Sequence, residues 1–365
     1  MKKLFLGMAL LAAAGMLADS ALAQGIGTAG VMRDEFALGL TPSIKSLGMG
    51  GAYLGLRGPR SMNPAALGGY ERIEGTLTYG LYDHQDGPLG HRGRLDVVLP
   101  NPFPNLIPLE MLETAVARFM VDGVISDGNE PTRLGSTIDY DSTTLGMQSG
   151  IKVMDWLNIG FGAYPFESAD VILEGPDYIL DGEGFSQFFS QQIGFLVTPH
   201  ERFSIGGEFV YIKDRMEAKF THRAPTPVVN PESIAAMVPA PGDVTESGRA
   251  YYHIRYFAIG AAFEPIDGTL LALDYWYGEI NGLNRWGFPY TDIDVSRWNF
   301  GAEQKLCDYF YVRAGSNNEG VTAGFTVRVN DDFDIDYAYA YGFLADKDAI
   351  FGRTDFHGIS ATYRF

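Results

Sequence analysis

The last strand-like segment of the chain, 354–365, alternates between two kinds of residue with a period of two. One row is apolar or aromatic and reads Ile359, Ala361, Tyr363 and Phe365. The other row is small or polar and reads Gly358, Ser360, Thr362 and Arg364. Because successive side chains of a strand point to opposite faces, the pattern predicts a strand with one face in lipid and the other in a polar lumen.

Two earlier segments, 320–329 and 333–343, repeat this alternation. In 333–343 the apolar row is mostly aromatic, and the opposite row contains Asp334 and Asp336. Arg328 lies on the polar row of 320–329. Placing these charges in lipid would cost several kcal/mol, so the polar rows are predicted to face inward in one fixed register.

Alternating segments recur from residue 73 to the C-terminus. We predict fourteen strands, at 73–83, 91–99, 113–122, 141–153, 157–166, 184–198, 202–220, 249–264, 269–281, 294–306, 309–316, 320–329, 333–343 and 354–365. Short turns lie at Met154–Trp156, Pro199–Glu201, Ile266–Gly268, Cys307–Asp308 and Asn330–Asp332, with a proline-rich connection at 101–111. An even strand number places both chain ends on the periplasmic side. The predicted fold is therefore all-β, a 14-stranded antiparallel transmembrane barrel over 72–365.

Two segments between predicted strands, 167–183 and 221–248, are expected to form long extracellular loops. The second contains Asn230 and Pro231, followed by an apolar turn at 234–237. Asn is a favoured helix N-cap and Pro is favoured at the first helical position, so we predict a short helix there.

The first 23 residues have the features of a cleaved signal peptide. Lys2 and Lys3 precede an apolar run, and the small residues around Leu22 supply a cleavage site. No later apolar stretch reaches the ~20 residues that a membrane-spanning helix needs. A closed barrel is the other structure that satisfies every backbone polar group in hydrocarbon. We therefore expect the protein in a bacterial outer membrane.

Residues 24–71 precede the first strand and show little strand periodicity. They contain a glycine cluster within Ser46–Tyr53 and the tripeptide 63–65, Asn-Pro-Ala. Glycines let the backbone pass close to a wall, and Asn-Pro fixes a turn. A 14-stranded barrel is wide enough to need a plug unless it is an open pore. We predict that 24–71 forms a hatch inside the lumen.

These two motifs resemble the N-terminal signature of the FadL family of outer-membrane transporters, in which S-x-G-x-G-G-A and N-P-A lie in the hatch domain. The resemblance carries over to six residues as hatch elements: Gly48, Gly50, Gly51, Asn63, Pro64 and Ala65. It implies passive uptake of hydrophobic compounds such as long-chain fatty acids, past the hatch or through a lateral opening in the wall. Unlike the family, the stretch between the motifs lacks an acidic pair and has Arg57 and Arg60.

A branch of the same superfamily serves protein secretion, and the resemblance leaves this alternative open. The barrel would then anchor a secretion or surface-assembly system and bind a partner protein through its loops. A continuous apolar tunnel is expected for transport, and a lumen filled by the hatch is expected for secretion.

Charged and aromatic residues near the C-terminus have expected roles of their own. Asp334 and Asp336 face the lumen, where they are expected to pair with the hatch residues Arg57 or Arg60. The terminal row looks like the signal read by the barrel-assembly machinery, with Tyr363 and Phe365 as its candidate residues. Pairing of this strand with the first strand would close the wall.

Charge and reactive residues exclude other classes of function. The net charge of −18 argues against binding of nucleic acid. None of the six histidines has a partner spacing that identifies a nucleophile, and no His/Cys cluster has zinc-ligand spacing. The single Cys307 has no internal partner. We therefore expect no enzyme activity, metal or cofactor; the expected partners are membrane lipid, the assembly machinery and a hydrophobic small molecule.

Overall fold

The computed structural model describes residues 43–84, 90–101, 114–126, 137–174, 178–222, 244–284, 292–318, 320–342 and 354–365. The signal peptide predicted for 1–23, the first part of the predicted hatch and the helix predicted near 230–237 lie outside these residues. The boundaries 24–71 of the hatch and 72–365 of the barrel therefore stay predictions. Among the described residues, no helix is long and apolar enough to cross a membrane.

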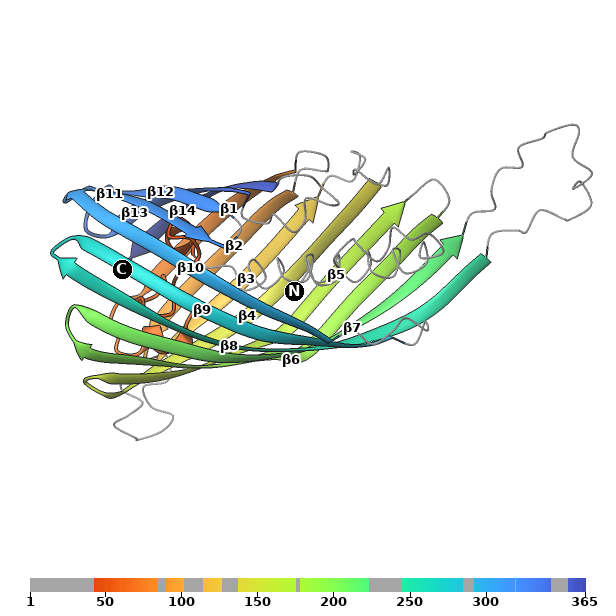
Figure 1. The fold of residues 1–365 in the computed structure, drawn as a ribbon, viewed down its shortest axis with the longest axis horizontal. Coiled ribbons are helices and arrows are strands. Elements are labelled where there is room, and N and C mark those ends of the chain that lie inside the picture. The colour runs from red at the N-terminus through yellow and green to blue at the C-terminus, as the bar shows by residue number, and fades with distance from the viewer. Residues whose placement is uncertain are drawn as a thin grey trace, which may run out of the picture.

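The described chain forms a closed antiparallel barrel of fourteen strands (Figure 1). The strands are β1 (Glu74–His84), β2 (Gly90–Pro100), β3 (Val116–Ser126), β4 (Thr137–Met154), β5 (Leu157–Glu174), β6 (Tyr178–His200), β7 (Phe203–His222), β8 (Val244–Ile266), β9 (Thr269–Asn284), β10 (Asp292–Cys307), β11 (Phe310–Asn317), β12 (Val321–Arg328), β13 (Phe333–Tyr341) and β14 (Thr354–Arg364). The first and last strands pair from Glu74 opposite Arg364 to His84 opposite Thr354, which closes the wall. The predicted fold class and strand number are confirmed.

The two rows of β12, β13 and β14 lie on the predicted faces of the wall. On β14, Ser360 and Thr362 are buried toward the lumen, whereas Ile359 and Tyr363 are each 46% exposed. Similar exposed apolar side chains cover the outside of most strands, among them Leu77, Leu95, Phe119, Phe161, Ile193, Phe209, Phe257, Leu273, Trp298 and Phe300. This wall, apolar outside and polar within, is that of a bacterial outer-membrane barrel.

The short turns agree with the prediction, but the two predicted outer loops do not. The connection predicted at 101–111 lies almost wholly outside the described residues. Turns join β4 to β5, β6 to β7, β8 to β9, β10 to β11 and β12 to β13 where they were expected. The loop predicted at 167–183 is wrong, since β5 continues to Glu174 and β6 begins at Tyr178. The loop predicted at 221–248 is also shorter, because β7 ends at His222 and β8 begins at Val244.

The physical reason for this correction is the length of the strands. A tilted strand crosses the hydrocarbon in about 9–11 residues, so the outer ends of 23-residue strands such as β6 and β8 pair beyond it. Both faces are then free of lipid, and the apolar alternation used for prediction fades. Backbone pairing continues without it.

A compact segment precedes β1 and lies inside the barrel, near the end with the short turns (Figure 1). We call residues 43–72 the hatch segment. It contains one turn of α-helix, α3 (Ile44–Leu47), and one turn of 3₁₀-helix, η1 (Pro64–Leu67). α3 contacts β12, β13 and β14, whereas η1 contacts β4, β5 and β6, so the hatch segment reaches different sides of the wall.

Candidate functional site

The glycine motif places hatch backbone directly against β10, β11 and β12. Gly50 has φ +70°, and a Cβ built on it would lie 2.4 Å from the carbonyl oxygen of Phe300. The Gly50 amide donates to Thr322 Oγ1 at 2.8 Å. Gly51 also has positive φ, and a Cβ on Gly48 would lie 3.3 Å from the Gly324 Cα. Side chains are excluded here because backbone packs on backbone.

The Asn-Pro-Ala motif is held by the Asn63 side chain, which is fully buried. Its Oδ1 accepts from the Ala65 amide at 3.1 Å and so caps η1. Its Nδ2 donates to the carbonyl of Leu54 at 3.2 Å within the hatch segment and to that of Phe195 on β6 at 2.9 Å. The Asn63 side chain therefore orders the turn, links it to Leu54 elsewhere in the hatch segment, and binds both to β6.

Three inward-facing glycines of β4, β5 and β6 receive this motif, and we call Gly150, Gly160 and Gly194 the glycine seat. A Cβ on Gly160 would lie 2.3 Å from the backbone of the motif, and one on Gly194 would lie 2.2 Å from Asn63 Oδ1. Gly150 would likewise meet the Pro64 carbonyl at 2.4 Å. The two motifs thus contact different parts of the wall, and the hatch segment fills the space between them.

Buried acids of the wall bind the middle of the hatch segment. Asp274 Oδ2 on β9 accepts from the amides of Tyr53 and Leu54 at 2.6 and 3.1 Å. The Tyr53 hydroxyl donates to Glu208 of β7 at 2.6 Å. Burial, together with the Glu208 carboxylate, raises the pKa of the Tyr53 hydroxyl well above its ordinary value. The hydroxyl therefore stays protonated and remains a donor.

A series of hydrogen-bonded, buried side chains continues from Glu208 across the inner wall. Glu208 accepts from Gln192 at 2.7 Å, Gln192 accepts from Gln148 at 2.8 Å, and Gln148 accepts from Arg118 at 2.9 Å. Both glutamines also donate to the Met62 carbonyl of the hatch segment. This series of hydrogen bonds joins β3, β4, β6 and β7 to the hatch segment.

These hydrogen-bonded side chains and Asp274 were not predicted from the sequence. They occupy inner-row positions of strands whose inner rows otherwise contain many small residues. Large polar residues at such positions are the signal that could have identified them, since each needs a partner inside the lumen.

Of the two hatch arginines, the structure places only Arg60 against the predicted acids. Its Nη2 contacts Asp334 and its Nη1 lies 3.3 Å from Asp336 Oδ1. Arg57 instead donates to the carbonyls of His200 and Phe203 at the β6–β7 turn. Arg60 therefore ties the hatch segment to β13, and Arg57 ties it to the opposite part of the rim.

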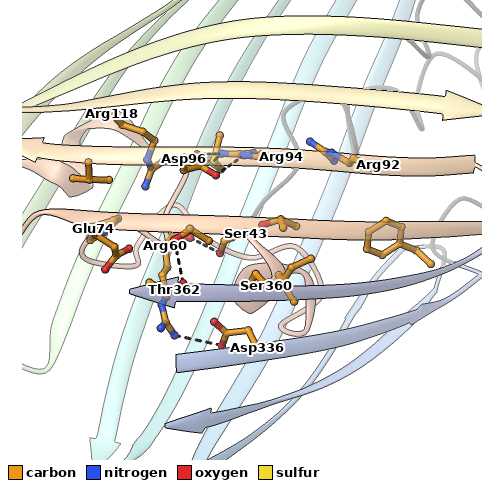
Figure 2. A pocket seen from close by; sticks show the side chains of 17 residues that line it. Ser43, Arg60, Glu74, Arg92, Arg94, Asp96, Arg118, Asp336, Ser360 and Thr362 are labelled. Atoms are coloured by element: carbon orange, nitrogen blue, oxygen red, sulfur yellow. Dashed lines mark hydrogen bonds and ion pairs between the residues drawn. The ribbon is translucent and has the colours of Figure 1, made fainter. Parts of the chain in front are cut away.

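Two cavities lie between the hatch segment and the wall, and charged side chains contribute to the lining of both. A cavity that we call the seam cavity lies between the hatch segment, β1, β2 and β14, and Figure 2 shows arginines on both sides of it. Its volume is about 40 Å³. This is room for roughly three water molecules and too little for an aromatic ring. A second cavity, the vestibule, opens at the rim beneath the hatch loop 55–60 and measures about 380 Å³. Among the described residues, neither cavity is an apolar tunnel.

An apolar groove of about 530 Å³ lies on the outer face of the wall over the glycine seat. Gly160 and Gly194 contribute to it, together with exposed side chains on β5 to β8: Ile159, Phe161, Ile193, Phe209 and Phe257. Only the backbone of the wall separates this groove from the Asn-Pro-Ala motif. The described residues contain no cluster of His, Cys, Asp or Glu that could hold a metal.

The predicted assembly residues lie at the rim beside the barrel closure. Phe365 is 73% exposed, and its amide donates to the Ile73 carbonyl at 2.9 Å. Tyr363 packs edge-on against the Phe365 ring with centroids 4.7 Å apart. Both rings point outward, where their role in assembly stays a prediction.

Comparisons with known proteins agree with this architecture. No family model matches the chain, and no curated protein matches its sequence. Among solved structures, the Ralstonia pickettii toluene transporter TbuX is 13% identical with a TM-score of 0.58, over 90% of this chain and 100% of that one.

Two further solved structures are similar. A Pseudomonas aeruginosa FadL homologue is 14% identical with a TM-score of 0.58, over 88% of this chain and 98% of that one. The CymD monoaromatic hydrocarbon channel is 15% identical with a TM-score of 0.57, over 89% and 98%. The chain therefore has the fold of the FadL-type outer-membrane transporters.

Proposed function

We propose that the protein carries small hydrophobic compounds passively across the outer membrane. The shared fold supports this proposal, since the similar structures are a toluene transporter, a monoaromatic hydrocarbon channel and a FadL homologue. The observation that carries it furthest is the apolar groove over the glycine seat. There a wall without inward side chains separates lipid from the hatch segment.

The lumen makes a straight axial path unfavourable for an apolar molecule. Hatch backbone packs on opposite parts of the wall, and charged groups such as Arg60 and Asp336 line the seam cavity between them. Transferring an apolar ligand through this space would displace bonded polar groups without replacing their partners. The ligand instead partitions from the outer mouth toward the glycine seat and leaves sideways into the apolar groove, driven by its own gradient.

The ligand classes to be distinguished are long-chain fatty acids and single-ring aromatic hydrocarbons. Both are apolar enough to favour the groove, where each buried CH₂ contributes about 0.8 kcal/mol. The aromatic hydrocarbons carry no charge, whereas fatty acids carry a carboxylate that must remain solvated or paired.

Uptake into proteoliposomes with Gly160→Val tests the proposal, for radiolabelled toluene and for palmitate. A Cβ at Gly160 displaces the hatch backbone from the wall, so the rate of uptake is expected to change severalfold for the true ligand class. Gly93→Val is the matched control, because a Cβ on Gly93 meets nothing within 4 Å.

Two results would contradict uptake through the glycine seat. If wild-type vesicles take up neither compound faster than protein-free vesicles, the uptake function is wrong. Equal rates in Gly160→Val and Gly93→Val would show that transport does not pass the glycine seat.

A second candidate function is an anchor for protein secretion or surface assembly. The ion pairs that hold the hatch segment to the wall favour it, because an anchor needs no path through the barrel. Purification of the barrel from its native membrane separates the two candidates. Co-purification of a stoichiometric protein with no enriched apolar ligand in mass spectrometry of bound lipids supports the anchor.

A further inference from the structure

The seam cavity has an excess of positive charge that its own residues do not neutralise. Its lining contains four arginines and three acids: Arg60, Arg92, Arg94, Arg118, and Glu74, Asp96, Asp336. The rest of the lining combines hydroxyl groups with apolar side chains. The hydroxyl groups include those of Ser43, Thr76, Ser360 and Thr362, and the apolar side chains include Ile44, Met62, Val98 and Phe356. Figure 2 shows Arg118, Arg94 and Arg92 in a row facing Arg60 and the hydroxyl groups.

Each lining acid already has a cationic partner. Asp96 accepts two hydrogen bonds from Arg94, at 2.6 and 2.7 Å. Glu74 accepts from Arg364 at 3.0 Å, and Asp336 binds both Arg60 and Arg313. The fourth lining arginine, Arg92, pairs with Asp122 outside the cavity.

Arg118 is the lining arginine that lacks a carboxylate partner among the described residues. Its side chain is 1% exposed and donates to the Ser61 carbonyl and to Gln148, both at 2.9 Å. Its Nε is buried without an acceptor. The Asp96 carboxylate acts on its charge through space, but that carboxylate accepts its hydrogen bonds from Arg94.

A buried charge without a counter-charge is unfavourable by several kcal/mol. Water in the cavity would solvate the guanidinium but would not neutralise it. An anion would accept from Arg118, from Ser360 and from one hydroxyl of the Thr76–Thr362 pair, whereas a cation would be repelled by the arginines. The Ser43 hydroxyl is not available, because it donates to the Arg60 carbonyl. The volume restricts the anion to a size of roughly three waters.

The vestibule gives such an anion a way in from the periplasmic rim. It adjoins the seam cavity, since Pro59, Arg60 and Glu74 line both. Six cationic side chains and four acids line it; the cationic ones are Lys45, Arg57, Arg60, Arg202, Arg328 and Arg364. In a chain of net charge −18, this local excess draws anions toward the hatch segment.

We propose that the seam cavity is a binding site for one small monovalent anion of the halide class. The anion sits between Arg118 and the hydroxyl groups of the seam and neutralises the arginine that holds the Ser61 carbonyl. It thereby strengthens the contact between the hatch segment and β3. This site does not depend on the proposed transport function.

Hydrogen exchange of the full-length barrel in detergent tests the proposal. Protection of the hatch amides near Ser61 is measured in chloride and in gluconate at constant ionic strength and pH. Chloride is expected to increase protection saturably, and gluconate, which is too large for the cavity, is expected to have no such effect. Crystals grown in bromide are expected to show an anomalous peak within hydrogen-bond distance of Arg118.

Two variants and a control make the test specific. Arg118→Gln is expected to raise the half-saturating chloride concentration at least ~10-fold, as for loss of one charge-assisted hydrogen bond. Ser360→Leu fills the cavity while keeping Arg118, so it is expected to abolish the chloride effect. Arg72→Gln removes an exposed arginine that pairs with Asp332 outside the cavity, and its chloride response is expected to match the wild type.

The proposal is overturned by any of three results. These are equal protection in chloride and gluconate, a bromide peak absent from the cavity, or a chloride response in Ser360→Leu equal to that of the wild type. If Arg118→Gln does not fold, Ser360→Leu and the bromide peak decide the question.

Discussion

Asn63 illustrates how single side chains determine the position of the hatch segment. It makes its contacts in full burial, where a lost partner is not replaced by water. The sequence singled out this residue and the motif glycines as hatch elements, because Asn-Pro and clustered glycines have strong local preferences. It left Arg57 and Arg60 as equal partners for the wall acids, since spacing alone cannot tell which of two nearby side chains turns inward.

Replacement of Asn63 by Ala should loosen the hatch segment. Two buried carbonyls, of Leu54 and Phe195, lose their donor, which costs about 1–3 kcal/mol. Hydrogen exchange of residues 60–67 is expected to accelerate accordingly. Asn158→Ala is the control, because that side chain donates only to the Gly68 carbonyl. Equal acceleration in both variants would contradict the central role of Asn63.

The two hatch arginines should respond unequally to the same substitution. Arg60→Gln removes charged contacts to Asp334 and Asp336, so the hatch segment is expected to lose about 1.5–3 kcal/mol of stability. Arg57→Gln removes bonds to exposed carbonyls and is expected to change it by less than about 0.5 kcal/mol. Urea titration followed by limited proteolysis of the hatch segment measures the difference, and similar midpoints would refute it.

At the scale of elements, the strands were predictable wherever lipid imposes alternation. The predicted bounds of β9, β11, β12 and β14 differ from the observed ones by three residues at most. The strands β5 and β6 were predicted too short, because their outer ends pair without lipid on either face. The contacts of α3 and η1 could not be predicted, since backbone packed on glycine leaves no side-chain pattern that names the partner strand.

The aromatic end of β14 provides a prediction for assembly. Phe365 is exposed, so Phe365→Ala is expected to change the stability of the finished barrel by less than about 0.5 kcal/mol. If the terminal ring is the assembly signal, the variant should nevertheless lower the fraction of folded barrel in cells severalfold, measured by heat-modifiable gel mobility. Tyr309→Ala, at an exposed turn aromatic, is the control and should fold normally. Equal folded fractions would exclude the signal.

At the scale of the whole molecule, wall and hatch segment form one closed unit. The inner rows of many strands carry at least one group that bonds to the hatch segment, and the two motifs brace it from different sides. The sequence predicted a plug but not the position of the hatch segment near the end with the short turns. That position depends on contacts with many strands together and is not encoded in any one segment.

The hatch segment inside the barrel predicts a low ionic conductance. Wild-type barrels in planar bilayers are expected to pass far less current than a variant in which Gly150→Val and Gly194→Val together displace the Asn-Pro-Ala motif. The physical reason is that ions need a continuous aqueous path, and the hatch segment interrupts it. A wild-type conductance equal to that of the variant would show that the lumen is open.

The closure between β1 and β14 has a consequence for the order of biogenesis. The hatch segment precedes β1 in the chain, whereas β14 is synthesised last and completes the wall. The contacts of α3 with β12, β13 and β14 can therefore form only after the last strands have been made. The part of the chain that emerges before the wall is thus among the last to reach its final contacts.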